Sequence, residues 1–582
     1  MAAIVNALDN HTSKQIGEKG HVEYGWSNNI REKIAQFSFQ VTRTKESDMD
    51  VLKNILRDIL IHMKKMLTNS SGTLPDKEVA KGHLSVLYKL IGNTRDIIDG
   101  KGEYALTYMM IYTWYEFYPE LAFFALKCLI DIGDEKIHPY GSWKDFKYFC
   151  SYCKKQGANV SHPLIQYSIQ LLNHQLCQDS CNSELEMKIS LVARWIPREK
   201  STFGWLYQPL ACDYFSQYLR YAYTVEQQKK AILKCKTEYR KLLSNLNNIL
   251  DTLQIKQCKN VWSTINFDNV TSISIVKQKK ALLNKNKNGS TKYPDNQDRV
   301  QCADNFKTHI QKSITGEKEV KGKRVGMEMF TKQALELSKQ YDSQEEKDLL
   351  NSQWRDNASQ TGALGKMIAM VDVSGSMSGD PLNVAIALGI RISEKSSLGK
   401  RVLTFSSDPS WVNLDGYDDF ISQVEVLQRA NWGMNTNFYA AMNLILDAII
   451  ENKMAPEDVQ DLILVILSDM QMDDGDKTLN KVALYDSINN LYAAAGERLH
   501  GKPFKPPHIL FWNLRSTSGF PSLSSQMNAS MMSGFSPSLL NLFCDQGIDA
   551  LQSATPWSQL ERLLDNPRYK IMSAKLEEVV EF

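Results

Sequence analysis

The segment that most constrains the fold is residues 367–376, MIAMVDVSGS, an apolar run that ends in three oxygen-bearing side chains. The run shows no polar alternation, which predicts a central parallel strand covered on both faces. Asp372, Ser374 and Ser376 follow at spacings of two, before a turn and a stretch, 381–396, with the apolar spacing of a helix. This order places the oxygens at the carboxyl edge of a sheet, where open α/β folds bind ligands. One carboxylate and two hydroxyls are hard donors suited to Mg²⁺.

Three later segments predict further strands of the same sheet, and two more residues with oxygen-bearing side chains lie in its loops. KRVLTFS (400–406), DLILVILSDM (461–470) and PHILFWNL (507–514) are short apolar runs. The second of these ends in Asp469, and a glycine-containing loop before an amphipathic helix carries Thr436. Because parallel strands end at one edge of the sheet, we expect both residues to lie near the first loop.

This pattern resembles the von Willebrand factor type A domain and its metal-ion-dependent adhesion site. In that family an Asp, two Ser, a Thr and a later Asp surround Mg²⁺ directly or through water, and a carboxylate of the bound partner often completes the octahedron. The resemblance implies that Mg²⁺ or another divalent cation is held by Asp372, Ser374, Ser376, Thr436 and Asp469. The alternative is that they are turn and cap residues, since Asp and Ser are common where helices begin.

The same loop lacks the pattern of a hydrolase. A phosphoaspartyl enzyme requires a second carboxylate two residues after Asp372, where Ser374 stands. The nucleophile elbow G-x-S-x-G requires serine at the position of Met377. The loop contains no Cys or His to act as nucleophile or base. We therefore expect a binding protein and not an enzyme.

Composition sets the broad class of the protein. The 582 residues, with 43% hydrophobic and 23% charged residues, are ordinary for a globular protein of two to four domains. The start, MAAIVNALDNHTSKQ, has no basic-then-apolar signal, and no apolar run reaches the ~18 residues of a membrane span. Ten cysteines are sparse for this length, which favours reduced thiols and a cytoplasmic location.

One cluster has the residue types of a zinc site. It comprises Cys150, Cys153, His162, His174, Cys177 and Cys181. Zinc sites do use C-x2-C pairs such as the first two cysteines. The last two, however, form C-x3-C within LLNHQLCQDSCN, which predicts a helix and its end. Unligated cysteines in a helical layer are the favoured interpretation, and zinc stays an open alternative.

The chain before residue ~360 has a helical pattern throughout. Segments such as MDVLKNILRDILIHMKKML and EYRKLLSNLNNILDTLQ repeat apolar residues at spacings of three and four, with short turns between them. We expect a multidomain protein: an all-α, helical-repeat-like region at 1–340 with a polar loop at 284–299, a linker at 341–362, and a doubly wound α/β type A domain at 363–582.

Further segments extend the resemblance over most of the chain. TRDIIDGKGEYAL (94–106), HPYGSWKDF (138–146) and ARWIPREKSTF (193–203) resemble an uncharacterised eukaryotic and giant-virus family that joins a helical region to a type A domain. The layout is more distantly similar to the Ro (TROVE) ribonucleoprotein, whose ring of helical repeats binds structured RNAs and the ends of misfolded RNAs. Within RDIIDGKGE we expect ion pairs and a capped turn, from Arg95, Asp96, Lys101 and Glu103.

Charge is distributed unevenly along the chain. Residues 221–324 contain 21 Lys and Arg against 9 Asp and Glu, although the whole chain has a net charge of only +2. Such a basic band attracts phosphate. The RNA-binding candidates are Lys229, Lys230, Lys234, Arg240 and Lys241. The alternative is a solvated lysine-rich face, because the band has few aromatic residues and no RNA-recognition signature.

Three hypotheses follow for the function. The first is a Ro-like protein that binds structured RNA through its helices and a partner through its metal site. The second is a protein-interaction scaffold that captures an acidic side chain at the metal and binds no RNA. The third, a metal-assisted enzyme, lacks a base or a nucleophile in the sequence.

Overall fold

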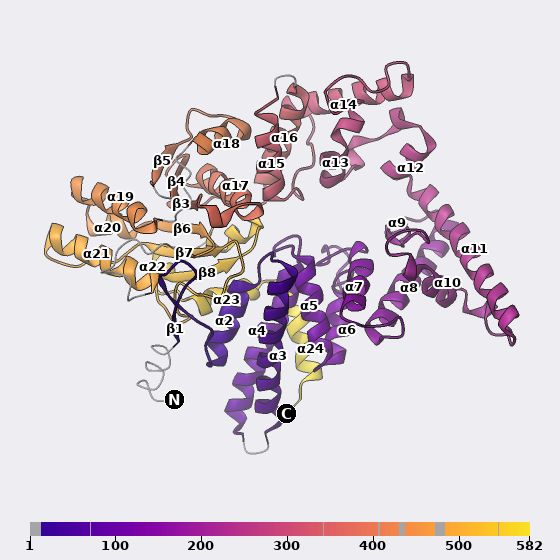
Figure 1. The fold of residues 1–582 in the computed structure, drawn as a ribbon, viewed down its shortest axis with the longest axis horizontal. Helices are drawn as coiled ribbons and strands as arrows, with labels where there is room; N and C mark the ends of the chain where they lie inside the picture. The colour runs from indigo at the N-terminus through magenta and orange to yellow at the C-terminus, as the bar shows by residue number, and fades with distance from the viewer. Residues whose placement is uncertain are drawn as a thin grey trace.

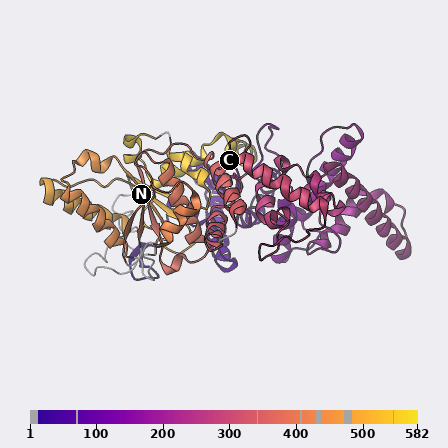
Figure 2. The same ribbon diagram turned by 90° about the horizontal axis from the view of Figure 1, so that it is seen from above.

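The computed structural model describes residues 13–69, 72–340, 343–405, 408–429, 437–471, 483–544 and 546–581. Within these ranges the chain forms a helical region followed by a mixed six-stranded sheet with helices on both faces (Figure 1). The expected combination of a helical region and an α/β region is confirmed. The molecule is elongated, with the sheet at one end and the long helix α11 (Val225–Leu250) at the other (Figure 2).

The helical region is built from amphipathic helices with clear start signals. The Asp76 amide donates to the Thr73 hydroxyl at the start of one helix, and Thr224 and Gln227 form a capping box at α11. The remaining helices are α2 (Ile30–Gln40), α3 (Glu46–Thr68), α4 (Leu74–Arg95), α5 (Tyr104–Tyr115), α6 (Pro119–Lys127), α7 (Lys144–Lys155), α8 (Pro163–Glu184), α9 (Val192–Trp195), α10 (Tyr207–Tyr214), α12 (Leu253–Lys259), α13 (Ser272–Leu282), α14 (Gln297–Ile314), α15 (Met327–Leu337) and α16 (Gln344–Ala358).

The chain leaves the first helices along α7 to α11 and returns through α12 to α16 toward the sheet (Figure 1). As a result α13 lies opposite α7 and α9, although more than a hundred residues separate α13 from α7 in the sequence. The polar segment expected to be a loop at 284–299 is irregular up to Asn296, where α14 is capped by the Asn296 side chain.

The sheet has the strand order β5-β4-β3-β6-β7-β8, and every neighbouring pair is parallel except β4 with β5. Its strands are β3 (Met367–Asp372), β4 (Arg401–Phe405), β5 (Ser410–Asn413), β6 (Ile463–Ser468), β7 (His508–Asn513) and β8 (Ala529–Ser533). The four strands expected from the sequence are β3, β4, β6 and β7. The sequence pattern missed β5, which is short and half exposed, and β8, whose Ser and Met residues are not typical of strands.

Helices cover both faces of the sheet. Val371 of β3 packs on one face against α17, whereas Met370 packs on the other face in a core shared with α19 and α21. Burial on both faces explains why these strands are uniformly apolar. The helices of this region are α17 (Asp380–Lys395), α18 (Phe420–Arg429), α19 (Phe438–Glu451), α20 (Pro456–Gln460), α21 (Leu484–His500), α22 (Ile548–Gln552), α23 (Pro556–Leu564) and α24 (Lys570–Val579).

Both ends of the chain cross from one region to the other. The hairpin of β1 (Lys14–Ile16) and β2 (Val22–Tyr24) lies beside the sheet, where Tyr24 and Phe520 exchange backbone hydrogen bonds. At the other end, α24 packs against α4 and α6 (Figure 1). The segment 341–362, expected to be a linker, contains α16, which packs against α14, α15 and α18. The two regions are therefore held together by shared cores.

The motif RDIIDGKGE lies at this junction and supplies buried polar contacts. Arg95 donates two hydrogen bonds of 2.8 Å to Asp145, and Arg568 of the C-terminal segment donates to Asp96. Glu103 pairs with Arg43, so the expected ion pairs are confirmed at three of the four motif positions. The fourth residue differs, because the buried Lys101 donates to Ser38 O, Val41 O and Ser533 Oγ. Among the described residues, no helix is long and apolar enough to cross a bilayer.

Candidate functional site

The candidate metal site begins at the carboxyl end of β3, the central strand of the sheet. Asp372 is the last residue of the strand and has no exposed surface. The chain then makes one 3-10 turn, η5 (Gly375–Met377), and enters α17 after Gly379. Gly379 has φ of 99°, a left-handed conformation that glycine adopts without steric cost. The turn keeps Ser374 buried and leaves Ser376 partly accessible.

Hydrogen bonds fix the Asp372 carboxylate and the two hydroxyls close to one another. The Ser374 amide donates to Asp372 Oδ1 at 2.9 Å, and Ser468 Oγ donates to Asp372 Oδ2 at 2.6 Å. The hydroxyl oxygens of Ser374 and Ser376 are 3.1 Å apart. Three of the residues expected in the site therefore lie together.

Asp469 follows β6, the neighbour of β3, and also has no exposed surface. Its Oδ2 accepts a hydrogen bond of 3.1 Å from Arg515, which follows β7. Burial and, second to it, the charge of Asp469 together raise the pKa of Asp372 to about 6. The two buried carboxylates thus lie close enough for their charges to repel each other, and a bound cation would reduce this repulsion.

The donor set fits a hard divalent cation. Adjacent ligands of an octahedral Mg²⁺ with bonds of about 2.1 Å are about 3.0 Å apart, and the Ser374 and Ser376 hydroxyls already have this separation. Among the described residues, no group of three or more His, Cys, Asp or Glu side chains is placed to hold a metal. The candidate site relies instead on two carboxylates and two hydroxyls. Thr436, the fifth expected ligand, lies outside the described residues.

The N-terminal hairpin reaches this site, which the sequence pattern did not predict. Lys19, in the turn between β1 and β2, donates from Nζ to Ser376 Oγ at 3.1 Å. The adjacent Glu18 amide donates to the Gln471 side chain at 2.9 Å, two residues beyond Asp469. The Glu18 carboxylate lies 3.8 Å from Arg515. Residues from opposite ends of the chain thus surround the candidate cation position.

The cysteine and histidine cluster does not form a metal centre in the described part of the chain. Cys150 and Cys153 are buried on α7, where burial raises the pKa of the Cys150 thiol to about 12. Cys177 and Cys181 are exposed on α8. These cysteines therefore lie on two helices, with one pair buried and the other exposed.

The lysines proposed from the sequence as RNA contacts lie on the surface of α11. Lys229, Lys230 and Lys234 are exposed, and Lys234 Nζ lies 4.0 Å from the centre of the Tyr218 ring. Arg240 and Lys241 pair with Glu199 and Glu238, respectively. These acidic partners reduce the positive charge of the C-terminal half of this face.

A second cationic surface forms where α7, α9 and α13 approach one another. We call it the basic-aromatic face; it comprises Lys144, Lys147, Tyr148, Arg194, Trp195, Phe203 and Lys277. Lys147 Nζ lies 4.8 Å from the Trp195 ring centre and 5.6 Å from that of Phe203. Among the described residues, none of the four cations forms an ion pair with a carboxylate.

Burial and the positive charges of this face lower the pKa of two of its lysines. Burial lowers the pKa of Lys147, and the charges of Lys144 and Arg194 lower it further. Burial also lowers the pKa of Lys144; the charge of the neighbouring Asp145 opposes this effect, and the charge of Lys277 on α13 adds to it. Four cations therefore share one surface with aromatic rings and lack paired acids, the combination that nucleic-acid phosphates and bases require.

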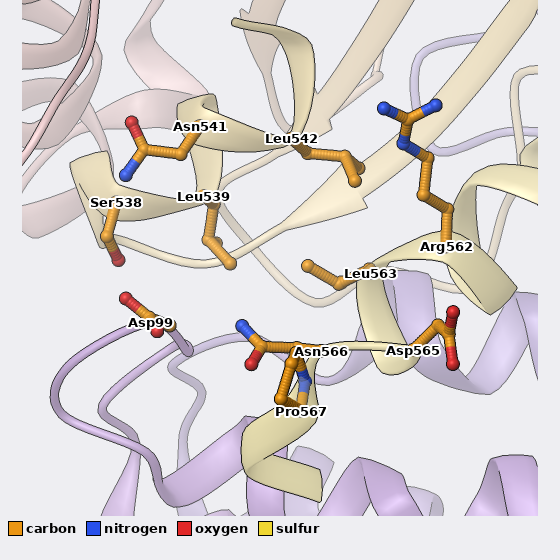
Figure 3. Close-up of a pocket in the computed structure, with 10 residues that line it drawn as sticks. All are labelled: Asp99, Ser538, Leu539, Asn541, Leu542, Arg562, Leu563, Asp565, Asn566 and Pro567. Carbon is orange, nitrogen blue, oxygen red and sulfur yellow. The ribbon is translucent and has the colours of Figure 1, made fainter. Parts of the chain in front are cut away.

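A polar pocket of about 340 Å³ lies elsewhere, at the junction of the two regions (Figure 3). Asp99, from the loop after α4, faces the C-terminal segments that carry Ser538 and Asn566. The Asp99 carboxylate is 3.8 Å from Arg568, within the ion-pair network of RDIIDGKGE. This pocket belongs to the contact between the regions and is separate from the sheet edge.

Several residues of the two candidate sites were missed from the sequence. Ser468 directly precedes Asp469 in LSDM, so its proximity to the first loop could have been inferred from the strand pairing. The proximity of Arg515 could have been inferred in the same way, because it lies two residues after β7, the neighbour of β6. Lys19 had no such signal, because a hairpin more than 350 residues away reaches the site only through the tertiary fold.

Comparisons with known proteins identify relatives without a described activity. Residues 366–573 match the family described as Domain of unknown function (DUF7788). The chain is also 28% identical over 473 residues to Uncharacterized protein L728 of Acanthamoeba polyphaga mimivirus, which covers 78% of this chain and 76% of the relative. The similarity to the viral protein therefore extends from the sheet into the helical region.

Proposed function

We propose that this chain is a non-enzymatic binding protein whose C-terminal region is a type A domain with a Mg²⁺-dependent partner site. The cation would be held by Asp372, Ser374, Ser376 and Asp469, with Thr436 as the further expected ligand. The observation that carries the proposal is the fully buried Asp372 carboxylate beside two hydroxyls 3.1 Å apart. The strand order, with β3 central and an antiparallel edge strand, supports the type A assignment.

The donor set also indicates what the site would bind. Hydroxyl ligands are neutral, and the Asp469 carboxylate is already paired with Arg515, so part of the charge of a divalent cation is left uncompensated. An acidic side chain of a partner protein is therefore the natural ligand for a remaining coordination position. Bound Mg²⁺ would supply a point of positive charge, and the turn at 375–379 would hold the hydroxyls in place for it.

Calorimetric titration with Mg²⁺ tests the metal site directly. Asp372→Ala and Asp469→Ala should each abolish measurable binding, while the circular dichroism spectrum is unchanged because both residues lie at the carboxyl ends of strands and outside the apolar cores. Asp461→Ala is the matched control, since this exposed carboxylate pairs with Lys366 beyond the other end of β6. Equal Mg²⁺ affinity in wild type and both site variants would refute the proposal.

A second candidate function is binding of structured RNA by the helical region. The observation that favours it is the basic-aromatic face, where Lys144, Lys147 and Arg194 lie beside aromatic rings and Lys277 adds a fourth positive charge. We propose this face as the RNA-binding surface, in preference to α11, where Arg240 and Lys241 already pair with glutamates. The RNA function and the metal site are independent of each other.

One purification separates the two functions. Protein recovered from cells with and without EDTA is assayed for bound RNA and for bound proteins. Co-purifying RNA that is lost at high salt but retained in EDTA supports the helical RNA site. Protein partners lost only in EDTA, with no RNA present, support a scaffold that acts through the metal alone.

A further inference from the structure

The β1–β2 hairpin closes the sheet edge at which the proposed metal site lies. Its turn brings Lys19 Nζ within 3.1 Å of Ser376 Oγ, one of the hydroxyls expected to hold the cation. Beneath it, Asp372 and Asp469 have no exposed surface. In this arrangement the Lys19 ammonium lies at Ser376, where the cation and the carboxylate of a partner would have to meet.

The base of the hairpin is anchored by buried contacts that do not involve Lys19. Gln471 donates to the Glu23 carboxylate at 3.1 Å, and both side chains are buried. A Cβ atom at Gly519 would lie 1.7 Å from Glu23, so the Glu23 carboxylate is seated against the backbone there. Tyr24 pairs with Phe520 through backbone hydrogen bonds. The strands are thus fixed, and the turn places a lysine at the site.

The turn itself is attached through Lys19 and through the partly exposed Glu18. The Glu18 amide donates to Gln471, and the Glu18 side chain is 55% exposed although it lies 3.8 Å from Arg515. Gly20, at the end of the turn, has φ of 96°, which permits a tight reversal. The tip can therefore move without disturbing the buried anchors at Glu23 and Tyr24.

Charge makes Lys19 and a divalent cation alternatives at this position. An ammonium group that donates to Ser376 occupies an oxygen lone pair that the cation would need. With both present, the two positive charges would repel each other in a region of little solvent. The ammonium group thus contacts a residue expected to hold the cation, and it is positively charged like the cation.

We infer that Lys19 is a built-in competitor for the divalent cation, and that the β1–β2 turn is a lid that opens when the cation binds. The inference rests on the proposed metal site. Cation binding displaces the ammonium, the tip of the hairpin moves, and the acidic partner gains access to the metal. Partner binding then depends on two linked events, metal loading and lid opening.

The test compares Lys19→Met with Lys14→Met in the full-length protein. Lys14 is on the same hairpin and has the same charge, but its ammonium lies 5.8 Å from the Tyr24 ring centre, away from the site. Calorimetry with MgCl₂ should show about tenfold or greater tightening for Lys19→Met, because a like charge at the site is removed. Lys14→Met should match the wild type.

Hydrogen exchange provides the second measurement. In the wild type, saturating Mg²⁺ should accelerate exchange in a peptide covering 15–20, because the Glu18 amide loses its Gln471 acceptor when the turn lifts. In Lys19→Met this exchange should already be fast without Mg²⁺. Exchange in the peptide that contains Glu23 and Tyr24 should stay slow in all samples.

The possible outcomes distinguish a failure of the lid from a failure of the metal site. Equal Mg²⁺ affinity in wild type and Lys19→Met, with exchange at 15–20 unaffected by Mg²⁺, overturns the lid while leaving the metal site in place. No Mg²⁺ binding in either protein overturns the metal site and the lid together. Tightening by Lys14→Met to the same extent would overturn a specific role for Lys19, because general charge would then explain the result.

Discussion

The sheet edge and the basic-aromatic face both concentrate charge of one sign, yet they differ in exposure. At the sheet edge, Asp372 and Asp469 are fully buried, and Arg515 contacts only the second of them. On the helices, the cations of the basic-aromatic face are exposed or half-buried and lie beside aromatic rings. A single compact cation can neutralise a buried pair of carboxylates. A solvated cationic surface can instead bind an extended polyanion.

The comparison also separates the energetic roles of the two regions. The buried Asp372 carboxylate destabilises the metal-free protein, because burial disfavours its ionised form, as its pKa of about 6 indicates. The exposed lysines cost less, since water screens their repulsion. Charge changes should therefore alter stability at the sheet edge and ligand affinity at the helices.

The largest expected effect is on RNA affinity when charges on the basic-aromatic face are reversed. Lys147→Glu combined with Arg194→Glu should weaken binding of a labelled RNA hairpin by about a hundredfold, since two phosphate contacts become repulsive. Fluorescence anisotropy at several KCl concentrations measures both the affinity and its salt dependence. The slope of log K against log salt should shrink by about two.

The control for that experiment is the face proposed from the sequence. Lys229→Glu with Lys230→Glu makes the same change of charge on α11, where both lysines are exposed. We expect a smaller loss of affinity from this pair. A larger loss from α11 than from the basic-aromatic face would reverse the comparison and restore the assignment made from the sequence.

The next effect is on stability at the sheet edge. Asp372→Asn should raise the free energy of unfolding of the EDTA-treated protein by about 3 kcal/mol at neutral pH, because a buried charge is removed while the side chain keeps its shape. Urea denaturation measures this difference. Mg²⁺ should stabilise the wild type and leave Asp372→Asn unchanged.

The pH dependence of this difference has a definite sign. The pKa of Asp372 in the folded protein, about 6, lies above its ordinary value of 3.8, so the folded state holds the proton more tightly than the unfolded state. The metal-free wild type should therefore lose stability as the pH rises from about 4 to about 6. Below pH of about 4 the two proteins should be equally stable, and an unchanged gap there would point to a cause other than charge.

The sequence predicted best those features whose residues lie close together along the chain. Asp372, Ser374 and Ser376 lie within five residues, so one strand and one turn were enough to place them together. Asp469 required only that a second apolar run end at the same edge. The ion pairs of RDIIDGKGE were expected as a type of contact, but partners such as Arg568 could not be identified, because they come from the other end of the chain.

The features that the sequence did not reveal depend on contacts between distant segments. The expected linker contains α16, whose apolar residues are spaced for contact with α14 and α18 but are diluted by polar ones. The basic-aromatic face combines α7, α9 and α13, which lie far apart in the sequence and approach one another only in the fold. A count of charge along the chain favoured α11, because that helix concentrates its lysines in one stretch. A count of charge along the chain does not reveal which basic segments meet in the fold.

The smallest effect concerns the aromatic part of the basic-aromatic face. Trp195→Leu should weaken RNA binding by about fivefold, since one stacked base is worth about 1–3 kcal/mol and leucine retains part of the contact. Because Lys147 and Arg194 stay in place, the salt slope should be the same as in the wild type. Trp411→Leu, which changes an exposed tryptophan on β5, is the matched control and should leave affinity unchanged. A change in the salt slope with Trp195→Leu would mean that the ring positions the cations instead of stacking on a base.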